Sequence, residues 1–214
     1  MDNDIINLAT PGVRGLQPYV PGKPIEELER EYGVTNVIKL ASNENPLGPS
    51  PKALAAARAA LPEIARYPDG GGFTLKRALA AKLGVLPGQI VLGNGSNDIL
   101  EFAARAFVTA QDEVMFSQHA FAVYPIVTQA VGARAVEVPA RNWAHDLDAM
   151  HAAITARTRL IFIANPNNPT GTWLRGAALE TFLDKLPTSV IVVMDEAYFE
   201  YVEASDYPNT VAWL

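Results

Sequence analysis

The sequence predicts an α/β fold in which a mostly parallel sheet carries helices on both faces and follows an extended N-terminal arm. Helical and strand-like segments alternate from Ser50 onward, which is the order of a parallel sheet with right-handed crossovers. Two strand-like segments, residues 160–163 and 190–194, are apolar throughout, as strands buried on both faces are. Prolines are frequent in the first 50 residues, where they favour extended backbone.

The chain is expected to divide after residue 50. Residues 1–50 are predicted to form the arm, interrupted by one short helix over 25–32, because Pro24 suits a helix start and Gly33 a helix end. Residues 51–214 are predicted to form an incomplete large domain. Its expected elements are helices over 51–61 and 74–83, a strand over 89–92, a helix over 98–108, a strand over 113–116, a helix over 121–132, a strand over 135–138, a helix over 146–154, a strand over 160–163, a helix over 176–186 and a strand over 190–194.

The composition is that of a soluble globular protein. Of its 214 residues, 49% are hydrophobic and 19% are charged, and the formal net charge of −6 argues against non-specific nucleic-acid binding. The absence of cysteine excludes a disulfide scaffold and thiol catalysis, and no metal site is expected. The first four residues lack the basic and apolar regions of a signal peptide, and no apolar stretch reaches the length of a membrane span. We therefore expect a cytoplasmic protein with no membrane partner.

One predicted loop, residues 92–97, is rich in glycine. It reads Leu-Gly-Asn-Gly-Ser-Asn and leads into the next helix. Glycines let the backbone approach a ligand, and the N–H groups of a helix N-terminus suit a phosphate. A plain turn between a strand and a helix explains the same residues about as well.

Two further loops follow apolar strands, where open α/β sheets bind ligands. Residues 164–171 contain three asparagines and two prolines. The asparagine side chains could form turns by bonding to the backbone of the loop itself, or they could bind a ligand. We favour a binding loop. Asp195 ends the last apolar strand. Its carboxylate needs a partner there, which is either a helix N-terminus or a cationic ligand nitrogen, and the ligand is the sharper hypothesis.

Several sequence motifs stand in one order along the chain. Residues 165–171 read Asn-Pro-Asn-Asn-Pro-Thr-Gly, and residues 195–198 read Asp-Glu-Ala-Tyr; they resemble the fold-type-I pyridoxal-phosphate (PLP) aminotransferases of the aspartate aminotransferase superfamily. Further motifs are Val-Arg-Gly-Leu-Gln-Pro-Tyr at 13–19, Leu-Ala-Ser-Asn-Glu-Asn-Pro at 40–46, Arg-Tyr-Pro-Asp at 66–69 and Gly-Asn-Gly-Ser-Asn at 93–97. With these, the whole chain resembles the histidinol-phosphate aminotransferase family, which implies the large domain of that fold.

The resemblance implies PLP as the cofactor and gives each candidate a role. Asp195 would pair with the pyridine nitrogen and keep the ring an electron sink. Asn168 and Tyr198 would bond the phenolic oxygen, and Phe121 would stack on the ring. The cofactor phosphate would be held by Asn94, Gly95 and Ser96, and by Tyr67 of the neighbouring subunit of a homodimer.

The resemblance also implies the reaction and its substrates. Tyr19, Asn43 and Asn168 would line the pocket of a phosphorylated amino-acid substrate, L-histidinol phosphate, and glutamate with 2-oxoglutarate would form the second pair. Tyr124 lies one helical turn from Phe121 and is expected to face the same site. The family's Schiff-base lysine is expected beyond Leu214, so the chain contains no catalytic residue of this kind and is expected to be a truncated, inactive portion.

Other functions remain open on the sequence. Related PLP enzymes decarboxylate phosphothreonine or transaminate aromatic or aliphatic amino acids, and the residues that would discriminate them are expected after Leu214. A non-catalytic fragment, serving as an interaction module or as half of a reassembled enzyme, is a third hypothesis. A nicotinamide-binding domain is a distant fourth, because no glycine fingerprint supports it.

Overall fold

The computed structural model describes residues 4–214 and contains two compact units. One unit comprises the residues up to Tyr19 together with Val91–Leu214, and the other comprises Val20–Ile90. Each is described by itself below. The expected division after residue 50 stays a prediction.

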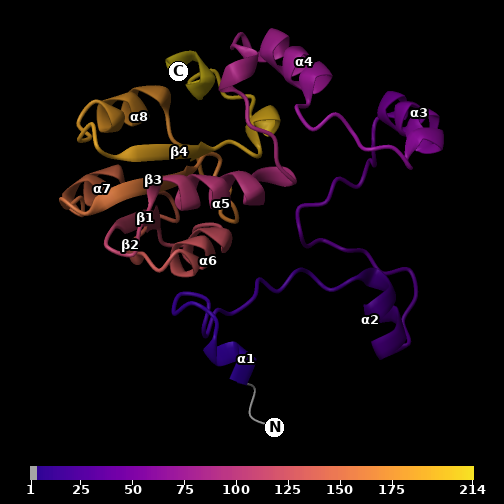
Figure 1. Cartoon of the computed structure of the whole chain (residues 1–214), viewed down its shortest axis with the longest axis horizontal. Helices are drawn as coiled ribbons and strands as arrows, with labels where there is room; N and C mark the ends of the chain where they lie inside the picture. Colours follow the sequence, from indigo (N-terminus) through magenta and orange to yellow (C-terminus); the bar gives the residue numbers. More distant parts are fainter. Residues whose placement is uncertain (1–3) are drawn as a thin grey trace. The chain divides into compact units, whose positions relative to one another are not determined.

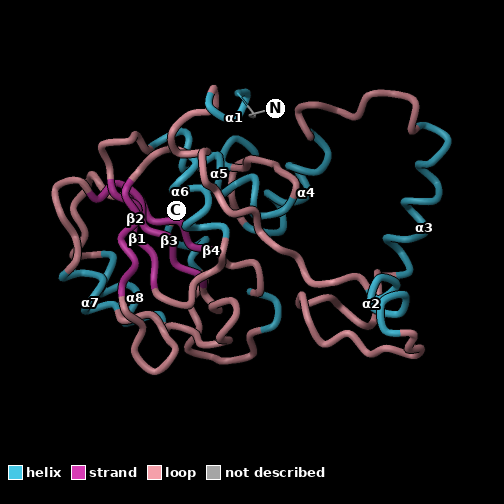
Figure 2. Tube along the Cα trace, turned by 90° about the horizontal axis from the view of Figure 1, so that it is seen from below, coloured by secondary structure: helices cyan, strands magenta, loops and turns pink. Residues whose placement is uncertain are grey.

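The larger unit is built on a four-stranded sheet. Its strands are β1 (Glu113–Ser117), β2 (Arg134–Val138), β3 (Thr158–Ala164) and β4 (Ile191–Asp195). They lie in the order β2-β1-β3-β4 (Figure 2). All three pairings are parallel. This confirms the predicted parallel sheet.

Helices cover both faces of this sheet (Figures 1 and 2). On one face, α5 (Gly95–Phe107) and α6 (Val123–Ala130) pack against Leu160 and Phe162 of β3. On the other, α7 (Leu147–Ala152) and α8 (Gly176–Leu183) pack against the alternate β3 residues, Ile161 and Ile163. All four of these β3 side chains are fully buried, which explains why the strand has no polar alternation.

Shorter elements complete the larger unit. They are α1 (Asp4–Asn7) and two 3₁₀ turns, Phe199–Tyr201 and Thr210–Trp213. In the part of the chain that the structure describes, no helix is both long and apolar enough to cross a bilayer, and no group of side chains has the makings of a metal site.

The smaller unit is helical. It contains α2 (Ile25–Tyr32), α3 (Pro51–Ala60) and α4 (Phe73–Leu83), with 3₁₀ turns at Leu61–Glu63 and Pro87–Gln89. The bounds of α2 are those predicted: Pro24 precedes it, and Gly33 ends it with a left-handed φ of 63°, which glycine adopts without strain.

The strand predicted over 89–92 is wrong. Gln89 closes a 3₁₀ turn, and the next three residues form no strand. Val91 is 67% exposed, so its apolar neighbours do not mark a buried strand here. A run of three apolar residues satisfies the local pattern of a strand but does not supply the neighbour that a strand must pair with.

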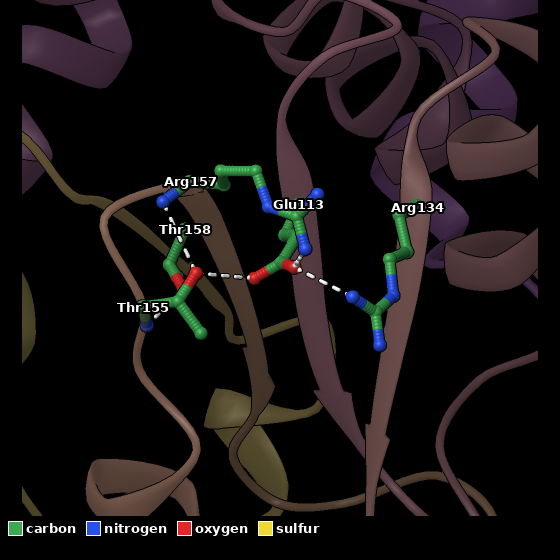
Figure 3. A network of polar contacts seen from close by, with 5 residues as sticks. All are labelled: Glu113, Arg134, Thr155, Arg157 and Thr158. Atoms are coloured by element: carbon green, nitrogen blue, oxygen red, sulfur yellow. Dashed lines mark hydrogen bonds and ion pairs between the residues drawn. The ribbon is translucent and has the colours of Figure 1, made fainter.

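A buried carboxylate ties the amino ends of the sheet together (Figure 3). Glu113, the first residue of β1, is only 1% exposed. One carboxylate oxygen accepts from Arg157 at 2.7 Å and from Arg134 at 3.1 Å, and the other accepts from the Thr155 hydroxyl at 2.6 Å. The Thr155 bond, assisted by the two arginine charges, holds the pKa of Glu113 below its ordinary value of 4.5 although burial opposes this. The network joins β1 to β2 and to the loop before β3.

We expect Glu113→Gln to lower the free energy of unfolding at neutral pH by about 1–3 kcal/mol, because a buried group loses charge-assisted hydrogen bonds. A lowered folded-state pKa means that this stabilisation is fully present above pH 4.5 and is lost as the pH falls through the folded-state value. Urea unfolding at neutral and acidic pH should therefore show the gap between wild type and variant narrowing in acid.

The matched control is Glu101→Gln, which breaks the exposed pair of Glu101 and Arg105 at 2.7 Å. This substitution should lower the free energy of unfolding by about 0–1 kcal/mol. Equal losses in the two variants would contradict a special role for Glu113.

Candidate functional site

A pocket opens at the carboxyl ends of β3 and β4. The side chains around it come from the last residues of these strands, the first turn of α5, the segment before α6 and the two loops that follow β3 and β4. Its lining consists of Ser96, Phe121, Ala164, Pro166, Asn168, Asp195, Ala197 and Tyr198. Five predicted site residues are thus brought together, although up to 102 positions separate them in the sequence.

Asp195 is the charged group of this pocket. As the last residue of β4, it is half-buried, and both of its carboxylate oxygens already accept hydrogen bonds. Oδ2 accepts from the hydroxyl of Tyr124 at 2.8 Å, and Oδ1 accepts from the amide of Ala197 at 3.2 Å. These two donors fix the orientation of the carboxylate at the pocket wall.

Tyr124 holds Asp195 from the core side. Its ring is fully buried and stacks on the ring of Phe162, with the ring centres 4.8 Å apart and an interplanar angle of 10°. It also makes an edge-to-face contact with Phe121, with the ring centres 6.0 Å apart. Burial and the adjacent negative charge of Asp195 raise the pKa of Tyr124 far above its ordinary value of 10. The hydroxyl therefore keeps its proton and acts only as a donor toward Asp195.

The three asparagines of the loop after β3 have two different roles, since two are bonded within the protein and one lines the pocket. Asn165 is fully buried, and its side-chain oxygen accepts from the amide of Leu174 at 2.7 Å. Asn167 is also buried and donates to the carbonyl of His119 and to Thr170 at 2.8 Å. Only Asn168 of the three lines the pocket. Two of the three asparagines are thus bonded to other parts of the protein or loop, and the third lines the pocket.

Two residues that the sequence did not single out brace this loop. Tyr207 donates its hydroxyl to the carbonyl of Asn165. His145 is buried, with Nε2 lying 2.8 Å from the carbonyl of Ala164; because a carbonyl only accepts, Nε2 carries the proton. Burial lowers the pKa of His145, which favours its neutral form. Both partners are far away in the sequence, so no local pattern marks these roles.

The glycine-rich turn starts α5. Gly95 has a φ of 73°, a left-handed value that favours glycine, and Ser96 in the first helical turn faces the pocket. Asn94 is turned back on the helix: its backbone and side-chain amides donate to Asp98 at 2.8 and 3.2 Å. The first-turn N–H groups of a helix are suited to an anion.

The other predicted residues lie outside the pocket lining. Tyr19 packs its ring edge-on against Phe121, with the ring centres 6.2 Å apart. Asn43 and Tyr67 belong to the smaller unit, where Asn43 has a left-handed φ of 49° and Tyr67 is fully exposed. None of the described residues that line the pocket is a lysine.

The model of the family described as aminotransferase class I and II matches residues 35–214. The chain belongs to this family. It is 60% identical to a protein of Pseudomonas fluorescens named histidinol-phosphate aminotransferase 2, over all of this chain and 58% of that one. It is 58% identical to a protein of Nitrosococcus oceani named histidinol-phosphate aminotransferase 1, over 97% of this chain and 56% of that one.

A solved structure confirms the fold. Histidinol-phosphate aminotransferase from Sinorhizobium meliloti, in complex with pyridoxal-5′-phosphate, matches with a TM-score of 0.83 at 32% identity, over 93% of this chain and 53% of that one. The resemblance expected from the motifs is therefore confirmed at the level of the family and the fold. The chain spans a little more than half the length of these relatives.

We expect Tyr124→Phe to lower the free energy of unfolding by about 1.5–3 kcal/mol, because a charged acceptor loses a part-buried hydrogen bond while the ring packing stays. Chemical denaturation monitored by circular dichroism measures this. The control is Tyr201→Phe, in a ring that is 73% exposed, which should change stability by no more than about 0.5 kcal/mol. Equal stabilities of the two variants would count against the bond to Asp195.

Proposed function

We propose that this chain supplies the cofactor-binding residues of a PLP-dependent aminotransferase that acts on L-histidinol phosphate with 2-oxoglutarate as amino acceptor, in histidine biosynthesis. The observation that carries the proposal is the convergence of a fixed carboxylate, an aromatic wall and a helix N-terminus in one pocket. The names of the relatives support the substrate.

The donor set of the pocket fits PLP. The Asp195 carboxylate is held by two donors, and it suits the protonated nitrogen of a pyridine ring. Phe121 offers a flat apolar face that suits the ring itself. The first turn of α5, with the hydroxyl of Ser96, suits the dianionic phosphate.

When bound, PLP supplies an electron-withdrawing ring that stabilises negative charge at the Cα of an amino-acid substrate. The residues of the chain make this possible by position and charge. Asp195 would hold a proton on the ring nitrogen, and the Tyr124 hydroxyl keeps the carboxylate in place. Asn168 and Tyr198 are assigned to the phenolic oxygen of the ring. Phe121 would shield one ring face from water.

The remaining assignments concern partners and substrate. We assign Tyr67 to the phosphate group of the neighbouring subunit's cofactor in a homodimer, together with Asn94 and Gly95 within the chain. Tyr19 and Asn43 are assigned to the substrate pocket, beside Asn168. Glutamate and 2-oxoglutarate form the second substrate pair. The family resemblance supports these roles.

By itself the 214-residue chain is proposed to hold PLP without a covalent bond and without turnover. The supporting observation is that the described lining of the pocket offers a carboxylate, an amide and hydroxyls but no amine. The lysine that forms the covalent bond in the family stays assigned to a segment after Leu214.

In a fluorescence titration, PLP should bind the chain, and Asp195→Asn should weaken the affinity about tenfold or more, as expected when a charge-assisted hydrogen bond loses its charge. Asp148→Asn, in a side chain that is 91% exposed on α7, should bind like wild type. Borohydride reduction should label no unique lysine. Equal affinity of the two variants, or one specifically labelled lysine with turnover, would contradict the proposal.

The reaction itself is tested in a form of the protein extended to the length of its relatives. We expect amino transfer from histidinol phosphate to 2-oxoglutarate. Release of carbon dioxide from phosphothreonine would instead favour a decarboxylase, and transfer only from aromatic or aliphatic amino acids would favour another aminotransferase of the family.

A further inference from the structure

The arm comes very close to α6 at Gly12. A Cβ placed on Gly12 would lie 2.2 Å from the carbonyl oxygen of Gln129 and 3.0 Å from both the carbonyl oxygen of Ala130 and the amide nitrogen of Gly132. All three are backbone atoms, which cannot rotate out of the way. Glycine is therefore required here by space, since any side chain would push the arm off the end of the helix.

An open hollow of about 470 Å³ lies beside this contact. Pro11 and Gly12 of the arm line it, together with residues of α6 and of the segment that follows it: Pro125, Gln129, Gly132, Ala133 and Ala135. The close contact at Gly12 is the seat of the arm, and open space borders it.

Hydrogen bonds fold residues 9–16 of the arm into a turn around Gly12. The amide of Val13 donates to the carbonyl of Thr10 at 3.0 Å, and that of Leu16 donates to Val13 at 3.2 Å. The Arg14 guanidinium folds back on the carbonyl of Ala9 at 2.7 Å. These bonds form a compact turn over residues 9–16. Because the turn is bonded internally, the position of Gly12 also fixes the position of the residues that follow it as far as Leu16.

Three residues after the last bond of this turn, the arm reaches the candidate site. Tyr19 meets Phe121, a wall of the pocket, edge to face with ring centres 6.2 Å apart. Tyr19 is still 50% exposed, and a single exposed aromatic pair is a weak anchor for seven residues of chain. A second point of attachment must hold the ring in place.

We propose that Gly12 is a positioning residue, which seats the arm on the end of α6 and thereby keeps Tyr19 against Phe121 at the edge of the pocket. The part of this inference that concerns the substrate rests on the proposed function. The docking of the arm does not, and it is tested separately in the 214-residue chain.

Hydrogen exchange of the amides of Val13, Arg14 and Leu16 reports the seat. In Gly12→Ala we expect about tenfold faster exchange in the arm, while β3 keeps its protection. Gly88→Ala is the matched control, because a Cβ at Gly88 meets nothing within 4 Å. Tyr19→Ala should leave the arm turn protected, since the seat at Gly12 stays intact.

Three results would overturn the seat. They are wild-type exchange in Gly12→Ala, an equal loosening of the arm turn by Tyr19→Ala, and a loss of β3 protection in Gly12→Ala. The first would mean that the close approach holds nothing, the second that Tyr19 is the anchor, and the third that Gly12 supports the whole unit rather than the arm.

In a protein extended to the length of its relatives, Gly12→Ala should raise KM for the phosphorylated substrate several-fold and change kcat by less than about twofold, as a loss of binding contacts does. The double variant Gly12→Ala/Tyr19→Ala should be no worse than Tyr19→Ala, because both changes remove the same contact. If the increases in KM caused by Gly12→Ala and Tyr19→Ala added up in the double variant, the proposal that Gly12 acts by positioning Tyr19 would be overturned. Absence of turnover in the wild-type protein would refute the proposed function and leave the exchange result to decide the seat.

Discussion

The central constraint of this structure is the burial of β3 on every side. Thr158–Ala164 pairs with β1 on one edge and with β4 on the other, and helices cover both of its faces. Its side chains alternate between two apolar clusters, so neither face tolerates a polar group without a partner. The first polar residue of the chain after the strand, Asn165, is therefore forced to the sheet's carboxyl edge, where the pocket lies.

Two polar residues at that edge, Asn165 and Asp195, already have protein partners. Asn165 is bonded to the amide of Leu174 and to the hydroxyl of Tyr207, and Asp195 is bonded to Tyr124 and to the amide of Ala197. Because these groups are already ordered, binding a ligand costs little additional conformational freedom. Asn168 and Asp195 line the pocket beside these bonded groups, so part of the lining is ordered in advance.

The sequence predicted the parts of this architecture that local pattern determines. Apolar runs at residues 160–163 and 190–194 marked the buried strands, and Pro24 and Gly33 marked the ends of α2. The run at 89–92 misled because three apolar residues carry no information about a pairing partner. Tyr124 illustrates the corresponding limit for the site. Its place one turn after Phe121 was visible, but its partner Asp195 stands 71 residues away, and only the folded sheet brings the two together. His145 and Tyr207 were missed for the same reason.

The rigidity of the site falls from the sheet toward the arm. Asp195 ends an edge strand that pairs with β3 along its whole length, and Asn168 belongs to a loop tied at several points. Tyr19 belongs to a segment held by one close backbone contact and one aromatic contact. Groups that must act on a cofactor with fixed geometry gain from a stiff support, because small displacements of such groups cost much of their effect. Groups that admit and release a substrate gain from a support that opens at low energetic cost. The proposed function assigns the PLP contacts to the well-supported sheet edge and the substrate contacts to the weakly held arm. The strength of the support therefore agrees with what each group of residues is proposed to do.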